Sequence, residues 1–156
     1  MATDRTAFPA TKAEILVAGN NVQSFIASGA ITKGQVVAID ATGVTMTVRA
    51  AVVESGEAPV GVAIASVTAA EATAGKQVPV AMIGCIVYVS NYASDVDMDA
   101  GDLVTTNDCA IGGSVIACSG AATQELVGRM LEDSTGASLT MEKMLVLCGC
   151  TSVIHA

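Results

Sequence analysis

The chain has 156 residues, enough for one compact domain with a substantial core but too few for two independent domains of ordinary size. Hydrophobic residues make up 52% of it, yet Trp is absent and Phe and Tyr number two each, so an aromatic platform for stacking bases or sugars is not expected. The net charge is −8 and the seven basic residues stand singly, which excludes the cationic stripe of a nucleic-acid-binding protein.

Hydropathy gives two further expectations. The longest apolar run, Val78 to Val89, contains Pro79 and Gly84 and is too short to span a bilayer, so no membrane partner is expected. The mean hydropathy of +0.60 is nevertheless high, and surplus apolar surface favours burial between subunits, which predicts a homo-oligomer. The N-terminus lacks the sustained apolar core of a secretory signal, from which we expect synthesis and folding in the cytosol.

In chain order, the first 14 residues are mostly polar or small and include Pro9, so they are expected to form an arm without a core of its own. Residues 15–17 and 22–26 are largely apolar and flank Ala18-Gly19-Asn20-Asn21, whose turn residues predict a β-hairpin. Residues 1–29 are therefore assigned to an N-terminal arm and hairpin.

The remainder is predicted to be nearly all strand. Segments rich in apolar and β-branched residues and bounded by Gly, Pro or small polar residues predict strands at 35–40, 44–53, 60–67, 77–90, 102–106, 114–118, 125–131, 143–148 and 151–154. Only 69–74 and 121–126 contain successive helix formers, and both are short. The predicted fold class is all-β, a compact barrel or sandwich that occupies residues 30–156.

The predicted strands fall into two similar modules, at about 30–90 and 97–156. Residues 31–80 align without a gap with residues 98–147, 67 positions later, and ten of the fifty aligned positions are identical. Composition alone would give about four identities. The identical pairs are Gly34/Gly101, Val37/Val104, Val48/Val115, Ala50/Ala117, Val60/Val127, Gly61/Gly128, Thr68/Thr135, Ala70/Ala137, Thr73/Thr140 and Lys76/Lys143. An internal repeat of this kind predicts that each module buries its apolar face against the other.

Two of the repeated glycine pairs predict backbone features. Gly34 and Gly101 each precede an opening strand, where a turn residue with positive φ is expected. Gly61 and Gly128 lie within predicted strands, which indicates a bulge or a close backbone approach at both sites.

No motif for catalysis is present. The single histidine, His155, is the penultimate residue, so a Ser-His-Asp or Cys-His arrangement would depend on a fraying terminus. No phosphate-binding loop, dinucleotide-binding loop or zinc-protease motif occurs. We therefore expect no catalytic residue, no cofactor and no enzymatic activity.

The five cysteines predict buried thiols rather than a metal site. They are Cys85, Cys109, Cys118, Cys148 and Cys150. They include no C-x-x-C pair and lie mostly in apolar runs, where a free thiol behaves as a small hydrophobe. Cys148 and Cys150 would point the same way along a strand, but that pair lacks the two further ligands that zinc needs.

One charged cluster has alternating oxygen ligands like those of a calcium loop, between residues 95 and 102. Its Gly is seventh rather than sixth, and Thr106 in the twelfth place offers no bidentate carboxylate. The matching first-module positions are not acidic, which predicts that the fold does not need these carboxylates. They form a solvated acidic turn, a cation site or a charged subunit contact with Lys12, Lys33 or Arg49 of a neighbour. The weak metal candidates are Asp95, Asp97, Asp99 and Asp102.

The sequence between about residues 30 and 148 resembles the capsid cement, or head decoration, proteins of tailed viruses. The resemblance lies in Ala30-Ile31-Thr32-Lys33-Gly34-Gln35-Val36-Val37, in Ala100-Gly101-Asp102-Leu103-Val104, and in the segments Pro59 to Val67 and Val127 to Asp133. The five cysteines and the predicted hairpin are not part of that pattern.

The resemblance implies a non-enzymatic structural protein. Members of that family sit on the outer face of an icosahedral shell, commonly as trimers, and hold neighbouring major capsid subunits together. The expected partners are thus the major capsid protein and further copies of this chain, in the virion and, during assembly, in the host cytoplasm. A small β-barrel module that binds a cation or small ligand is the alternative.

Overall fold

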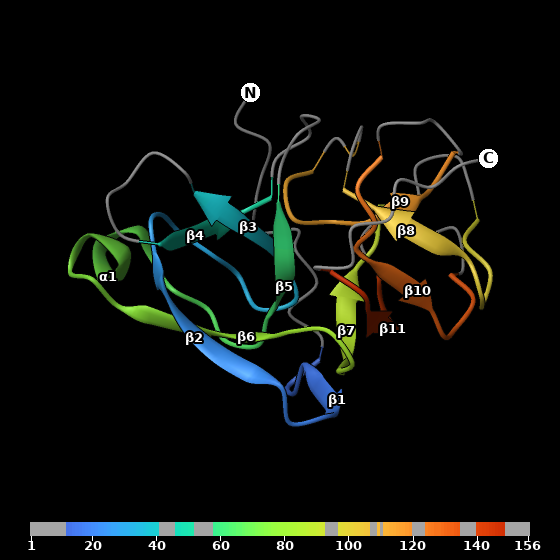
Figure 1. The fold of residues 1–156 in the computed structure, drawn as a ribbon, viewed down its shortest axis with the longest axis horizontal. Coiled ribbons are helices and arrows are strands. Elements are labelled where there is room, and N and C mark those ends of the chain that lie inside the picture. Colours follow the sequence, from blue (N-terminus) through green and yellow to red (C-terminus); the bar gives the residue numbers. More distant parts are fainter. Residues whose placement is uncertain are drawn as a thin grey trace.

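A computed structural model describes residues 12–40, 46–51, 58–92, 97–106, 109, 111–119, 124–134 and 140–148. The described part is almost entirely β-structure, as predicted, with one short helix (Figure 1). The elements are β1 (Leu16–Ala18), β2 (Val22–Ala27), β3 (Val36–Asp40), β4 (Thr47–Ala50), β5 (Pro59–Ala63), α1 (Ala69–Thr73), β6 (Gln77–Ala81), β7 (Ile86–Ser90), β8 (Leu103–Thr105), β9 (Ile116–Ala117), β10 (Gly128–Met130) and β11 (Met141–Val146).

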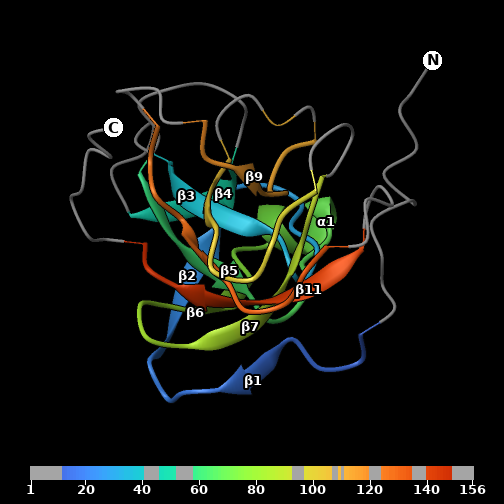
Figure 2. The ribbon, with the colours of Figure 1, turned by 90° about the vertical axis from the view of Figure 1, so that its right-hand side faces the viewer.

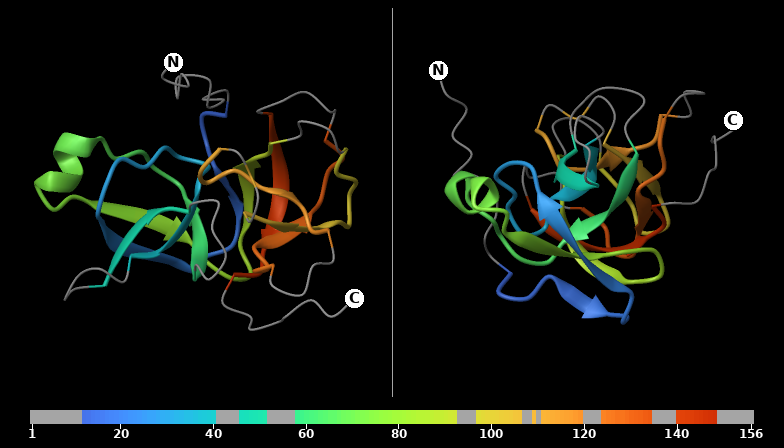
Figure 3. Two further views of the ribbon diagram at one scale, coloured as in Figure 1. Left: turned by 90° about the horizontal axis from the view of Figure 1, so that it is seen from above. Right: turned by 60° about the vertical axis from the view of Figure 1, so that its left-hand side comes forward.

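The strands form two rings that lie side by side (Figure 3). The first barrel is closed in the order β2-β4-β3-β5-β6. The second sheet has the order β1-β7-β11-β10-β8-β9, and a parallel bridge between Asn91 and Val115 joins its β7 and β9 ends. Strands β7 to β11 therefore form a second ring, called the second barrel below.

The hairpin prediction is wrong, although both of its strands exist. β1 pairs with β7 in the second sheet, whereas β2 pairs with β6 and β4 in the first barrel. Figure 2 shows β1 at the outer edge of the second sheet, beside β7. The two strands therefore belong to different sheets. β2 is thus part of the first barrel and does not belong to an appended N-terminal unit.

The central strands of the two barrels pair in the same register. Val37 pairs with Ala50 and with Gly61, and Val104 pairs with Ala117 and with Gly128, each residue 67 positions after its counterpart. These are positions at which the two halves of the sequence carry the same residue. Shared side chains at shared pairing positions explain why both halves adopt the same ladder.

The gapless alignment is wrong for the strands that flank this centre. Ala27 donates its N–H to the carbonyl of Lys76 (3.2 Å), and Asn91 donates in the same way to Thr140 (3.0 Å), so the offset here is 64 rather than 67. The offset changes twice. The connection from β7 to β8 is three residues longer than that from β2 to β3, and the connection from β10 to β11 is three residues shorter than that from β5 to β6, which contains α1. Lys76 therefore corresponds to Thr140 and not to Lys143.

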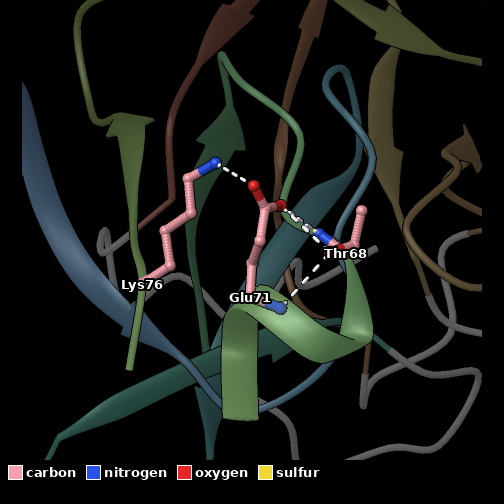
Figure 4. Close-up of polar contacts among 3 residues, drawn as sticks. All are labelled: Thr68, Glu71 and Lys76. Carbon is pink, nitrogen blue, oxygen red and sulfur yellow. Dashed lines mark hydrogen bonds and ion pairs between the residues drawn. The ribbon is translucent and has the colours of Figure 1, made fainter. Parts of the chain in front are cut away.

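The described residues contain one helix, α1, and side-chain hydrogen bonds at its N-terminal turn stabilise it (Figure 4). Thr68 and Glu71 form a capping box, in which each side chain accepts a hydrogen bond from the other's backbone N–H. Lys76 Nζ lies 2.6 Å from a Glu71 carboxylate oxygen, and this contact with the Thr68 bonds lowers the pKa of Glu71 to about 2. No helix in the described residues has the length and apolar character needed to cross a membrane.

Strand alternation divides the apolar residues between two cores. Val37, Val48 and Val78 face the interior of the first barrel. Val36 and Val62, one residue away in sequence from members of that interior, join the core that contains the second-barrel residues. β3 and β5 thus bury one face inside the first barrel and the other in the core shared with the second barrel.

Both glycine predictions are confirmed. Gly34 and Gly101 have φ of 87° and 104°, a region in which side chains with a Cβ are strained. A Cβ at Gly61 would collide with the backbone carbonyl oxygen of Ala81, and one at Gly128 would lie 2.6 Å from that of Leu145. Close backbone approach therefore requires glycine at both of the latter positions.

Candidate functional site

The acidic turn lies just before β8 and is closed by its own carboxylates. Asp99 donates its backbone N–H to Oδ2 of Asp102 (3.0 Å), and Ala100 donates to Oδ1 of Asp133 (2.8 Å). The Arg129 guanidinium donates to the carbonyl of Gly101 (2.7 Å). Two carboxylates thus accept hydrogen bonds from turn N–H groups that the sheet leaves unpaired, which is a structural task.

The first barrel performs the same task with uncharged side chains. Thr32 donates its backbone N–H to Oε1 of Gln35 (2.8 Å), and Lys33 donates to Oγ of Ser66 (3.0 Å). Asp102 and Asp133 lie 67 positions after Gln35 and Ser66. The turn thus has a side-chain acceptor at this position in both barrels, an amide in the first and a carboxylate in the second, in agreement with the prediction that the fold does not need a carboxylate there.

The structure does not gather the metal candidates into a ligand set. Asp95 lies outside the described residues, and no three His, Cys, Asp or Glu side chains in the described ranges are placed to hold a metal ion. Asp133 contacts this turn but was missing from the sequence-based candidates. Asp133 aligns with Ser66 in the repeat, and both have short side chains that can accept a hydrogen bond. This alignment could have identified Asp133 from the sequence.

A second polar cluster lies on the outer face of β7 and β11. The Nζ atoms of Lys12 and Lys143 lie 4.4 Å and 5.8 Å from the centroid of the Tyr88 ring, and Lys143 also pairs with Glu132 at 2.6 Å. The hydrogen bond with Lys143 lowers the pKa of Glu132, and the same bond raises the pKa of Lys143. Solvent screens exposed contacts of this type, so the cluster orders the chain before β1 only weakly.

Two lysines proposed as partners for a neighbouring subunit make contacts within this chain. Lys12 lies over Tyr88, and Lys33 Nζ donates to the carbonyl of Ala13 (3.2 Å). Both contacts involve the segment leading into β1. A charged subunit contact through either lysine would compete with them.

The third polar group lies inside the second barrel. Oδ1 of Asn91 accepts hydrogen bonds from the backbone N–H and the hydroxyl of Thr140 (3.1 and 3.0 Å). Glu142 lies two residues further along β11 and is only 7% exposed. Among the described residues, neither Nδ2 of Asn91 nor Oε2 of Glu142 has a hydrogen-bond partner. Burial raises the pKa of Glu142.

Sequence reasoning does not identify this group, because Asn91 and Glu142 lie just outside the predicted strands 77–90 and 143–148. The gapless alignment also hid it. At the offset of 64, Glu142 corresponds to Val78 and Asn91 to Ala27, both of which are buried apolar residues. A polar residue in one barrel at a position that is apolar in the other could have identified this group from the sequence.

Among the described cysteines, Cys85, Cys109 and Cys118 are free thiols. Cys85, Cys109 and Cys148 are buried, as predicted, and Cys118 is half-buried. Burial raises the pKa of Cys109 and of Cys118 to about 11, which keeps both thiols protonated and unreactive at neutral pH. Cys150 and His155 lie outside the described residues.

No family model matches the chain, and no curated protein sequence matches it. The fold is similar to a solved structure, the N base of the head fibre protein gp8.5 of bacteriophage phi29, with a TM-score of 0.54. The match covers 80% of this chain and 92% of that one, at 16% sequence identity. A likeness at this identity establishes a shared fold.

Proposed function

We propose that this chain is a non-enzymatic structural protein of a phage virion. In this proposal it decorates the outer surface of an assembled capsid and stabilises it by bridging major capsid subunits. The observation that carries the proposal is the fold shared with the head fibre N base over 80% of the chain. The resemblance of residues 30–148 to capsid cement proteins points to the same kind of protein from the sequence.

Charge and surface support an exterior location. A net charge of −8 suits a surface away from packaged nucleic acid better than one facing it. Met46, at 62% exposed, and other large apolar side chains on the surface favour contacts with further subunits. We propose a homotrimer built from protomers that each contain an internal repeat, with host cytoplasm as the place of assembly.

The test is binding to purified shells of the phage that encodes the chain. Tagged protein is mixed with shells stripped of it, and the bound protein is quantified after sedimentation, with an unrelated acidic β-barrel protein as control. Saturation at a fixed ratio to the major capsid protein, together with greater resistance of the shell to heat, is the expected result. No saturable binding, or binding without added shell stability, overturns the bridging role.

A further inference from the structure

The first half of β2 has a neighbouring strand on one side only, within the described part of the chain. Residues 22–26 pair with β6, but only Ile26 and Ala27 pair with β4. Figure 1 accordingly shows β2 at the periphery of the first barrel. Residues 22–25 are called the β2 edge below.

The peptide groups of Ser24 point away from β6 along this edge. Ala27 donates its N–H to Lys76 on the β6 side, and backbone groups alternate in direction along an antiparallel strand. Gln23 and Phe25 therefore also face β6, whereas Ser24 faces the open side. The residue opposite Ser24 is Pro79, which has no N–H to donate, in agreement with this alternation.

In the second barrel, the edge that corresponds to the β2 edge is covered by a strand. Tyr88 lies 64 positions after Ser24, at the offset that relates Asn91 to Ala27. The Tyr88 N–H donates to the carbonyl oxygen of Ile15 at 2.8 Å, and β1 pairs with β7 at the adjacent positions. β1 therefore covers the edge of β7 that corresponds to the β2 edge (Figure 2).

The β2 edge also lacks the features that usually prevent strand addition. Protected edges carry charged residues, proline or a bulge, whereas Val22-Gln23-Ser24-Phe25 has neither charge nor proline and pairs with β6 in an uninterrupted register. Ile83 lies beside the β2 edge, since its carbonyl accepts a hydrogen bond from the Asn21 side chain (3.1 Å). Its side chain is 40% exposed and so adds apolar surface there.

We propose that the β2 edge accepts an extended strand from a shell subunit, as β7 accepts β1. The segment on β7 is Ile15-Leu16-Val17-Ala18, so the expected occupant is short, uncharged and apolar. Pairing over four residues buries far less than the roughly 1,200–2,000 Å² of a stable interface, so this edge alone would not hold a second copy of the chain. A shell presents many copies of the same subunit close together, and this high local concentration offsets the weak binding at a single edge. The choice of a shell subunit as the partner rests on the proposed function.

Hydrogen exchange provides the first test. In the isolated chain, the Ser24 amide is expected to exchange quickly and the Tyr88 amide slowly, because among the described residues only the latter donates to a neighbouring strand. On shells, the exchange rate of Ser24 is expected to fall at least tenfold while that of Tyr88 is unchanged. Equal exchange of Ser24 in free and shell-bound protein overturns the inference.

Substitution at Ser24 provides the second test. Ser24→Pro removes the outward N–H without removing a donor to β6, although its ring also fixes φ at this position. Ser24→Lys introduces a charge that disfavours strand addition while keeping the backbone donor. Both are expected to bind shells at least tenfold more weakly than the unaltered chain, with Ser24→Ala as the control that binds normally. Full binding by Ser24→Lys and by folded Ser24→Pro overturns the edge assignment alone, whereas failure of the unaltered chain to bind overturns the proposed function as well.

Discussion

The two barrels have the same strand pairing but differ in the polarity of their interior side chains. Val78 lies opposite Phe25 in the first barrel, and Glu142 lies opposite Val89 at the corresponding place in the second. The strand pairing is the same although one interior position is a valine and the other a carboxylic acid. The ladder therefore follows from glycines and backbone pairing, while the interior side chains can change polarity without changing topology.

The edges differ as well. β7 has β1 along its outer side, whereas the equivalent side of β2 is open in the described structure. The first barrel instead contains α1 between β5 and β6, where the second has a shorter connection. Each barrel therefore has one added element at a different place, α1 in the first and β1 in the second. Different functions of the two barrels can arise at these elements.

The largest expected effect tests the shared strand pairing. Gly61→Ala puts a Cβ against the backbone carbonyl of Ala81, which cannot move without shifting β6. We expect a loss of about 3 kcal/mol in the free energy of unfolding, measured by chemical denaturation. Gly128→Ala should cost less, because part of its obstruction is the flexible side chain of Met144.

Gly29→Ala is the matched control, since no atom lies within 4 Å of its added Cβ, and it should leave stability within about 0.5 kcal/mol of the unaltered chain. Equal stability of the Gly29 and Gly61 variants would contradict a close approach of β5 and β6.

The next effect tests the difference in interior polarity. Glu142→Val gives the second barrel the residue of the first and removes a buried carboxylate oxygen that has no hydrogen-bond partner among the described residues. A gain of roughly 1–3 kcal/mol at neutral pH is expected from thermal or chemical unfolding. The reciprocal Val78→Glu should destabilise the first barrel.

The pH dependence of the same residue has a definite sign. Burial raises the pKa of Glu142, the nearby charge of Glu132 acts in the same direction, and the hydrogen bond from Thr140 and the charge of Lys12 oppose them. The contribution of Glu142 to stability is therefore fully present below its unfolded pKa of about 4.5 and is lost as pH rises through the higher folded pKa. Glu142→Gln should remove that loss; identical pH profiles for the two proteins would show that Glu142 is not buried in ionisable form.

Sequence patterns were sufficient for the fold class and for the glycines. The positive φ of Gly34 and Gly101 and the close approach at Gly61 and Gly128 followed from their repeated positions. In both cases the constraint falls on a single residue that must be glycine, so the residue type alone indicates it. Strand positions in the centre of each barrel were predictable for the same reason.

Pairing partners and interior polarity were not predictable in this way. The turn residues between β1 and β2 indicated a hairpin, but β1 pairs with β7 because that edge is available in the folded chain. The role of Asp133 depends on a contact 33 residues away in sequence. Glu142 was concealed by a three-residue change of offset, which only the observed hydrogen bonds define.

A smaller effect separates backbone strain from steric contact in the shared turns. Gly101→Ala forces a side chain into φ of 104° with no atom within 4 Å of the new Cβ, so about 1–2 kcal/mol of strain is expected. Gly34→Ala has comparable strain and must also displace the terminal methyl group of Met141. Denaturation midpoints should therefore fall further for Gly34→Ala, and the reverse order would contradict the placement of Met141.

The smallest effect decides whether the acidic turn is structural or binds a cation. If Asp102 serves as a turn acceptor, Asp102→Ala and Gln35→Ala should each lose about 1 kcal/mol of stability, and Asp102→Asn should lose little because its amide oxygen can accept the same bond. Calorimetry with calcium should then give equal heats for the unaltered chain and for an Asp97→Ala, Asp99→Ala variant. Saturable heat that is present in the unaltered chain and absent in this variant would instead establish a cation site in the second barrel. The first barrel lacks the carboxylates for such a site, so in that case the two barrels would differ in function at the turn where their backbone hydrogen bonds are the same.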